Sequence, residues 1–359
     1  MRSFQPIRSS LRYGIIRAGL ELTAIPFMPS LFPGAGGRGV VFTLHHVRPS
    51  APARFSPNAH LSVTPAFLEE AIKAVLEQGL IPVHLHDLPT LLADKPDRRR
   101  FVAFTLDDGY RNNATFAAPV FRKFGVPYTI FISSGFVERN HTAWWETAEA
   151  LIRKVSQFEF DFGSGVQTVP CKSLGQKLAA FDLFTELVRA VDEDEAVRRI
   201  DEAARAYGIS PVAIIDDLVM DKTELRALAE DPLAHFGAHT VSHVNLRRVK
   251  QDRLLEEIER SAHAVEQYAG KRPRSFSYPY GWRSAVSERE MAAVAEAGFP
   301  VAVTTQPGVL GEECLDHPMK LPRISLNGYY QKKRYVKALV SGVPFRLLAE
   351  NIRFSIEQQ

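Results

Sequence analysis

Two adjacent aspartates stand at the end of an apolar run. Asp107 and Asp108 follow "FVAFTL" and precede Gly109, which permits a sharp backbone turn. Two carboxylates about 4 Å apart repel each other by about 4 kcal/mol at an effective dielectric constant near 20. A half-buried pair is therefore expected to share a proton or to hold a cation. A solvated Asp-Asp-Gly turn is the alternative interpretation.

Two histidines follow a second apolar run at helical spacing. His239 and His243 lie four residues apart in "GAHTVSH", so a helical turn would direct both imidazoles to one side. With one carboxylate they supply two nitrogens and one oxygen, and they leave coordination positions open. Catalytic zinc sites have this layout, which also suits non-haem Fe(II). Capping or core histidines are the alternative.

Adjacent aspartates beside such an ion favour hydrolysis. One carboxylate can bind the metal while its neighbour stays free as a base. Zinc lowers the pKa of water from about 15.7 toward about 7 and polarises a substrate carbonyl, and a carboxylate within reach accepts the proton. The residues therefore predict a metal-dependent hydrolase.

The elements that must position these residues are strands of an α/β fold. Short β-branched and aromatic runs alternate with segments of helical period, the pattern of βα units around a parallel sheet. The predicted strands cover 40–47, 101–108, 128–134, 235–240, 275–279 and 301–305. Helices are predicted from Pro65, over 252–269 and after a capping box at Ser287 and Glu290.

We predict three parts in the chain. Residues 1–38 form an N-terminal helical and linker segment, 39–330 form the α/β domain, and 331–359 form a basic amphipathic tail. Between 136 and 230 the strand pattern disappears and charged helical segments replace it. We expect a helical insertion there that covers one side of the site.

Composition limits the partners. The 44 Lys and Arg residues face 41 acidic ones, a net charge of +3 that is too balanced to attract nucleic acid. No uncharged apolar run is long enough to predict a transmembrane helix. Arg17 and Glu21 interrupt the apolar stretch that an export signal would need. We expect a cytoplasmic protein.

The N-terminal segment leaves membrane contact open. Ile7, Leu11 and Ile15 recur every four residues beside Arg8 and Arg12, as in a basic amphipathic helix. Such a helix either lies on a membrane surface or packs on the domain. Peripheral membrane contact through the termini is therefore a second expectation, and the sequence predicts no oligomeric state.

Three motifs together resemble a known family. "TLDDG", "HTVSH" and "SYPYG" occur in this order after a "TLHHV" strand. They look like the motifs of the polysaccharide deacetylase family, the carbohydrate esterases that share the chitooligosaccharide deacetylase homology region. The first is similar to that family's Thr-Phe-Asp-Asp-Gly, with Leu106 for Phe, and the second fits its His-Ser/Thr-x-x-His motif. The resemblance covers about 40–328, interrupted by the insertion.

The resemblance implies a fold and a division of roles. The fold would be a distorted (β/α) barrel of about seven strands, with the site at their carboxyl ends, as in barrel enzymes generally. Asp107 would be the general base. Asp108, His239 and His243 would bind a divalent metal, usually Zn²⁺.

The same resemblance implies a sugar groove. The family's Pro-Tyr-Gly segment lines it and provides a backbone N–H to the oxyanion, which points here to Pro279, Tyr280 and Gly281. Trp145 of the "WWE" segment is a candidate for stacking on a sugar ring, with core packing as the alternative.

This chain departs from the family pattern at two places. Ser277 stands where the family often has the arginine that orients the base, and Arg323 is the candidate replacement. The family's late Leu-x-His is missing, and His45 at the end of the first strand is a candidate general acid or groove residue. Members with these departures resemble the branch that acts on exopolysaccharide or lipid-linked glycans.

We therefore expect a metal-dependent hydrolase that removes acetyl groups from N-acetylated sugars of an oligo- or polysaccharide. One alternative is hydrolysis of a non-sugar C–N amide bond on the same fold. Another is a catalytically degenerate glycan-binding module. The sequence does not specify which glycan is used.

Overall fold

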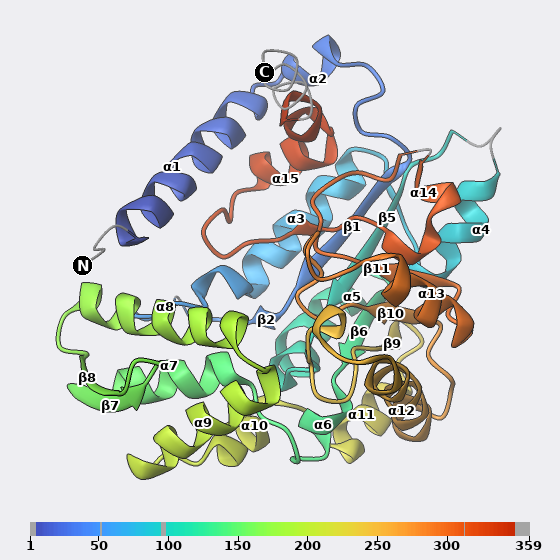
Figure 1. Cartoon of the computed structure of the whole chain (residues 1–359). Coiled ribbons are helices and arrows are strands. Elements are labelled where there is room, and N and C mark those ends of the chain that lie inside the picture. The colour runs from blue at the N-terminus through green and yellow to red at the C-terminus, as the bar shows by residue number, and fades with distance from the viewer. Residues whose placement is uncertain (1–4, 51, 95–97, 312, 349–359) are drawn as a thin grey trace.

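A curled sheet of parallel strands forms the centre of the protein. The computed structural model describes residues 5–50, 52–94, 98–311 and 313–348. Seven strands follow the order β11-β10-β9-β6-β5-β1-β12, and β4 pairs with the start of β5. All pairs in this sheet are parallel, and helices surround it (Figure 1). The predicted distorted (β/α)7 barrel is confirmed.

The strands are short, as expected for a small barrel. They are β1 (Gly39–Leu44), β2 (His46–Val47), β3 (Ser62–Val63), β4 (Ile81–Pro82), β5 (Phe101–Leu106), β6 (Tyr128–Ile132), β7 (Gln157–Asp161), β8 (Val166–Pro170), β9 (Ala234–Ala238), β10 (Ser275–Ser277), β11 (Val301–Val303) and β12 (Ile324–Ser325). The segment before β12 bridges the two edges of the curl, since Leu321 pairs with Val303 of β11 while Ile324 pairs with Phe42 of β1.

Fifteen α-helices occur among the described residues. They are α1 (Gln5–Thr23), α2 (Met28–Leu31), α3 (Pro65–Glu77), α4 (Leu88–Ala93), α5 (Ala118–Phe124), α6 (Ser134–Val137), α7 (Trp144–Lys154), α8 (Leu174–Ala190), α9 (Glu193–Ala206), α10 (Pro211–Leu218), α11 (Lys222–Leu228), α12 (Gln251–Ala269), α13 (Glu288–Glu296), α14 (Glu313–Asp316) and α15 (Lys333–Val340). Thr64 caps α3, and the predicted capping box of Ser287 and Glu290 begins α13.

Alternate residues of the strands pack on opposite faces of the sheet. Val41, Phe101, Ala103 and Phe131 face the barrel interior and pack in one cluster. The intervening residues, such as Phe104, face outward and pack under the surrounding helices in a larger cluster. Because side chains alternate along a strand, Asp107 continues the inward row of β5.

The insertion between 136 and 230 differs from the prediction in one respect. Its helices α7 to α11 are joined by an antiparallel hairpin of β7 and β8, which the sequence analysis missed. The hairpin sequence alternates Phe158 and Phe160 with polar residues before a Gly-containing turn, and that alternation is the signal of a strand with one buried face.

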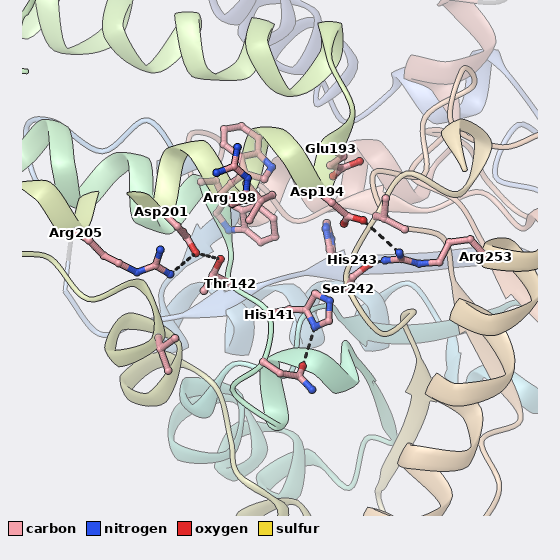
Figure 2. A pocket seen from close by; sticks show the side chains of 16 residues that line it. His141, Thr142, Glu193, Asp194, Arg198, Asp201, Arg205, Ser242, His243 and Arg253 are labelled. Atoms are coloured by element: carbon pink, nitrogen blue, oxygen red, sulfur yellow. Dashed lines mark hydrogen bonds and ion pairs between the residues drawn. The ribbon is translucent and has the colours of Figure 1, made fainter. Parts of the chain in front are cut away.

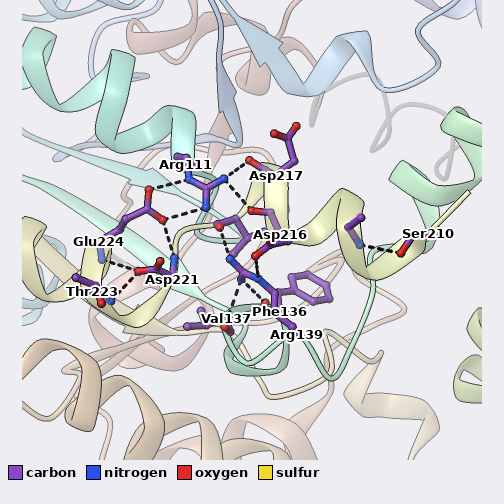
Figure 3. Close-up of polar contacts among 12 residues, drawn as sticks. Arg111, Phe136, Val137, Arg139, Ser210, Asp216, Asp217, Asp221, Thr223 and Glu224 are labelled. Atoms are coloured by element: carbon purple, nitrogen blue, oxygen red, sulfur yellow. Dashed lines mark hydrogen bonds and ion pairs between the residues drawn. The ribbon is translucent and has the colours of Figure 1, made fainter.

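Arg111, after β5, and Arg139, after α6, hold the end of the insertion (Figure 3). Arg111 donates to both carboxylate oxygens of Glu224, at 2.7 and 3.0 Å, and to the carbonyl of Asp216. Arg139 donates to the carboxylate of Asp216 and to the carbonyl of Val219, both at 2.9 Å. Helices α10 and α11 are thereby attached beside β5 and α6.

The two terminal segments pack against each other. Arg334 of α15 and Lys332, directly before that helix, form ion pairs with Glu21 of α1. Of the predicted amphipathic N-terminal helix, the side chains of residues 7, 8, 11 and 12 lie outside the described residues, as do residues 349–359 of the predicted tail. Within the described ranges, no helix has the length and apolarity needed to cross a bilayer.

Candidate metal and catalytic site

Three potential metal ligands converge where two inner strands end. Asp108 follows β5, His239 follows β9, and the loop after β9 returns His243 to the same place. Their ligand atoms lie within 4.8 Å of one another, and all three side chains are buried. In the part of the chain that the structure describes, this is the one group of three such residues.

The geometry of the three groups fits a metal ion. The Nε2 atoms of His239 and His243 each lie 3.5 Å from Oδ1 of Asp108. A tetrahedral ion with ligands at about 2.1 Å holds them about 3.4 Å apart. The same Oδ1 is buried and has no hydrogen-bond partner in the structure, so an ion would satisfy it.

The backbone fixes which nitrogen of His239 faces the other ligands. Its Nδ1–H donates to the carbonyl oxygen of Ser277 at 2.6 Å, so Nε2 is free to bind a cation. Burial lowers the pKa of His239 and of His243, which keeps both imidazoles neutral. A neutral imidazole is the form that binds metal.

Asp107 is held by a fully buried arginine. The Arg323 guanidinium donates to both oxygens of Asp107 at 2.7 Å. Its remaining N–H groups donate to the carbonyl of Thr304 and to the hydroxyls of Thr105 and Ser277. All five donors of this side chain are therefore satisfied, although it is only 1% exposed. Arg323 thus contacts Asp107 and lies behind the cleft, away from where substrate would bind.

The pKa values of Asp107 and Asp108 are shifted in opposite directions. Burial alone would raise the pKa of Asp107, but the charge of Arg323 and its hydrogen bonds hold that pKa well below its usual range. Burial and the negative charge of Asp107 raise the pKa of Asp108. Asp107 is therefore an anion without further help, whereas Asp108 needs a cation beside it to remain one.

Backbone strain is concentrated at this site. Asp108, Thr240, His243 and Tyr280 have φ values between 59° and 72°, the left-handed region that residues other than glycine rarely adopt. One further non-glycine residue of the described chain, Arg139, does so. Such strain costs roughly 1–3 kcal/mol for each residue and persists only where the surroundings impose it.

A cleft of about 410 Å³ opens over the aspartates. His45, Trp145 and Tyr280 line it, whereas Pro279 and Gly281 form the turn beneath and are not among its lining residues. Helix α8 of the insertion provides Phe181 and further lining residues, so the insertion does cover one side of the site.

Trp145 is largely a wall residue. Its indole N–H donates to the hydroxyl of Tyr110 at 3.0 Å, and its ring lies 4.8 Å from that of His243. The exposed aromatic of the cleft is Trp282, which the sequence analysis did not single out. Arg189 lies over the Trp282 ring, with its guanidinium carbon 5.6 Å from the ring centre.

Further residues missed by the sequence analysis support the ligands from behind. Glu146 lies 3.1 Å from Nε2 of His46 and accepts a hydrogen bond from Tyr110. Burial would raise the pKa of Glu146, and the contact with His46 brings it below its ordinary value. A carboxylate in an amphipathic helix gave no sequence signal of a buried position.

Glu193 joins the insertion to the strained turn. The hydroxyl of Tyr280 donates to Glu193, and the indole N–H of Trp144 donates to that hydroxyl at 3.1 Å. Glu193, Trp144, Trp145 and His243 also line an adjoining cavity of about 350 Å³ (Figure 2). These four side chains therefore separate that cavity from the cleft.

The fold and the site together place this protein among the parallel (β/α) barrels that have a potential metal site, here Asp-His-His, at the carboxyl ends of their strands. The family model for polysaccharide deacetylase matches residues 94–169 and 191–302. The chain belongs to the polysaccharide deacetylase family. A search of curated protein sequences finds no significant match.

Solved structures of low sequence identity have a similar fold. The Streptococcus pyogenes deacetylase PplD in complex with acetate is 14% identical, with a TM-score of 0.52 over 81% of this chain and 93% of that one. IcaB from Ammonifex degensii is 16% identical, with a TM-score of 0.51 over 84% and 98%. A polysaccharide deacetylase from Bacillus cereus is 15% identical, with a TM-score of 0.52 over 84% and 68%.

Proposed function

We propose that this protein is a metal-dependent deacetylase that removes acetyl groups from N-acetylated sugars of an oligo- or polysaccharide. The observation that carries the proposal is the pairing of two differently held aspartates. Asp108 faces two neutral imidazoles and has an unsatisfied oxygen, while Asp107 is bound by Arg323. Membership of the family of polysaccharide deacetylases supports the same reaction.

Asp108, His239 and His243 would hold the ion, for which we propose Zn²⁺ because two imidazoles and one carboxylate suit it. A zinc ion at this position supplies Lewis acidity toward the amide carbonyl and lowers the pKa of water. Asp107 accepts the proton of the attacking water. Arg323 keeps Asp107 ionised and fixes the direction of its oxygens.

The cleft residues bind and orient the sugar. We assign the face of Trp282 to stacking on a sugar ring, because it is the exposed aromatic side chain of the lining, and we assign Trp145 to the inner wall. We assign the N–H donor to the oxyanion to the turn of Pro279, Tyr280 and Gly281, which is strained at Tyr280 and contributes Tyr280 to the cleft lining.

His45 extends the inward row of β1 into the cleft beside Asp107. Burial lowers its pKa to about 3, so the imidazole of the free protein is neutral and can accept a hydrogen bond from substrate. As its second role we propose that His45 passes to the leaving nitrogen the proton that Asp107 has accepted from the attacking water.

The test combines metal content with acetate release. In Asp107→Asn we expect the metal to remain bound while acetate release from N-acetylated glycans falls by about 10² to 10⁴-fold. In His239→Ala we expect both metal and activity to be lost. His263→Ala, at an exposed position of α12, is the matched control and should change neither. Equal loss of metal in the first two variants would contradict the division of roles.

The same assay separates the alternative functions. Acetate release from chitooligosaccharides or poly-N-acetylglucosamine would argue against hydrolysis of a small non-sugar amide. Binding of a glycan in calorimetry without acetate release, by protein replete with metal, would instead indicate a binding module.

A further inference from the structure

Exposed apolar side chains are concentrated on the N-terminal helices. Of the thirteen large hydrophobic side chains that are exposed among the described residues, six lie between residues 13 and 31. These six define what we call the terminal face: Tyr13, Ile15, Ile16, Leu22, Phe27 and Leu31. Ile15, Leu22, Phe27 and Leu31 are each more than half exposed. A cluster of this kind on a folded protein marks an interaction surface.

Two of the α1 residues of the terminal face, Ile15 and Leu22, lie opposite the packing side of the helix. Helix α1 contacts α15, and Leu20 packs with Tyr330 and Tyr335 in a small core. Leu20 and Thr23 are the buried side chains of the described part of α1. Ile15 and Leu22 therefore remain uncovered after the helix has packed, whereas Ile16 lies at the border of the packing side.

The charge around the terminal face is positive. The described terminal residues 13–38 and 331–348 contain seven Lys or Arg residues and one acidic residue, Glu21. The remainder of the chain has more acidic than basic residues. Three carboxylates at this end each face two cations: Glu21 faces Lys332 and Arg334, Glu77 faces Lys333 and Lys337, and Glu70 faces Lys73 and Lys333. Ion pairing therefore leaves a cationic surplus at this end.

We propose that the terminal face binds the surface of a bilayer that contains anionic lipids. Apolar side chains on a helix flanked by Lys and Arg insert at the boundary between headgroups and acyl chains, and the cations are attracted to anionic headgroups. A second copy of the chain fits this surface less well, because two copies in contact through this face would bring their positive charges together. The helix lies in the plane of the interface.

The position of α1 beside α8 relates the terminal face to the cleft. Helix α1 also contacts α8, which lies near it in Figure 1. Helix α8 provides one wall of the cleft. A protein docked through the terminal face therefore holds the wall of its cleft close to the lipid surface. The docking itself depends on no assumption about the reaction.

The test is binding of the full chain to lipid vesicles. We expect sedimentation with vesicles of phosphatidylcholine and phosphatidylglycerol, and binding that weakens with added salt and is at least about tenfold weaker for phosphatidylcholine alone. The variant carries Ile15→Ser, Leu22→Ser, Phe27→Ser and Leu31→Ser. It should bind the anionic vesicles at least about tenfold more weakly.

A matched variant uses exposed apolar residues of the insertion. Val166→Ser with Val212→Ser removes two exposed side chains far from α1 in sequence and should leave vesicle binding unchanged. Absence of binding to the anionic vesicles by the unmodified chain would overturn the proposal, as would equal weakening in the matched variant. A dimer in solution that the four-residue variant dissociates would replace the bilayer with a second copy. Acetate release from a soluble glycan should be the same in all three proteins, so this outcome is independent of the proposed reaction.

Discussion

The two ends of strand β9 carry histidines on the same inward face, and their surroundings differ. His239 at the carboxyl end meets Asp108 and His243, and the Ser277 carbonyl fixes its ring. His235 at the amino end lies among His84 and His86, with ring centres 6.2 and 4.3 Å away.

The lower cluster has three imidazoles but lacks the features of an ion site. The Nδ1 atoms of His84, His86 and His235 are buried without hydrogen-bond partners, so none of these rings is oriented by a bond such as the one from His239 to Ser277. The nearest carboxylate, that of Asp87, is exposed and lies 3.6 Å from His86. A cluster of histidines is therefore not sufficient for a metal site. The candidate site at Asp108 differs in having a buried carboxylate and a histidine ring that a hydrogen bond orients.

The largest expected effect is at Arg323. Arg323→Met leaves the charge of Asp107 buried and unpaired, which we expect to lower the free energy of unfolding by about 3 to 5 kcal/mol. Urea denaturation measures it. Arg198→Met, which removes an exposed arginine paired with Glu195 and Glu202, is the control and should cost less than about 1 kcal/mol.

A double variant distinguishes the effect of the unpaired charge of Asp107 from the effect of lost packing around Arg323. Adding Asp107→Asn to Arg323→Met removes the unpaired charge, so stability should recover in part while acetate release stays absent. If the double variant is as unstable as Arg323→Met alone, then packing and not charge is the reason that Arg323 is needed.

Metal binding should distinguish the two ends of β9 directly. At free Zn²⁺ a thousandfold above its dissociation constant, binding adds about 4 kcal/mol to the stability of the folded state. We expect one ion per chain, a higher thermal midpoint, and reversal by a chelator. His243→Ala should abolish the increase and His235→Ala should leave it unchanged. A second bound ion that His235→Ala removes would show that the lower histidines also form a metal site.

The sequence predicted the inner strands because their apolar runs are continuous and end at Gly, Asp or His. It could not locate β12, which has two residues and exists because the segment around Arg323 bridges β11 and β1. The hairpin of β7 and β8 carried an alternating signal that the charged helices around it obscured.

The site was predictable to the extent that its residues are neighbours in sequence. The pairs Asp107 with Asp108 and His239 with His243 are local motifs, so their types and spacing were visible. The contact of Arg323 with Asp107 spans 216 residues, and the sequence offered it only as a replacement for an arginine missing at Ser277. Burial of Glu146 and exposure of Trp282 depend on tertiary packing, which residue type does not reveal.

A moderate loss of stability is expected from a substitution at Gly237, which lies in β9 between His235 and His239. Gly237 faces the barrel interior, where an added Cβ would lie 2.4 Å from the ring of Phe131. Gly237→Ala should therefore destabilise the fold by about 1 to 3 kcal/mol, as thermal or urea denaturation would measure. Gly175→Ala in α8, where no atom lies within 4 Å of the added Cβ, is the control and should be neutral or slightly stabilising.

The smallest expected effect is a pH dependence of stability that arises from the histidines at the amino end of β9. Burial, with the neighbouring His86 second, lowers the pKa of His235 to about 3, and burial lowers that of His86 to about 4. In the unfolded chain both titrate near about 6.5. Between these values the unfolded state binds more protons than the folded one, so stability falls as the pH drops from about 6.5 toward 4.

Replacing His235 with Gln removes one of the two protons that the unfolded state binds in excess of the folded state. The slope of the unfolding free energy against pH should decrease by about 1.4 kcal/mol per pH unit in this window, measured by urea denaturation at several pH values. His263→Gln, at an exposed position of α12 outside this cluster, is the control and should leave the slope unchanged. An unchanged slope in the His235 variant would mean that the lower cluster already takes up its proton in the folded state. The contrast between the two ends of β9 would then lie only in their ability to bind metal.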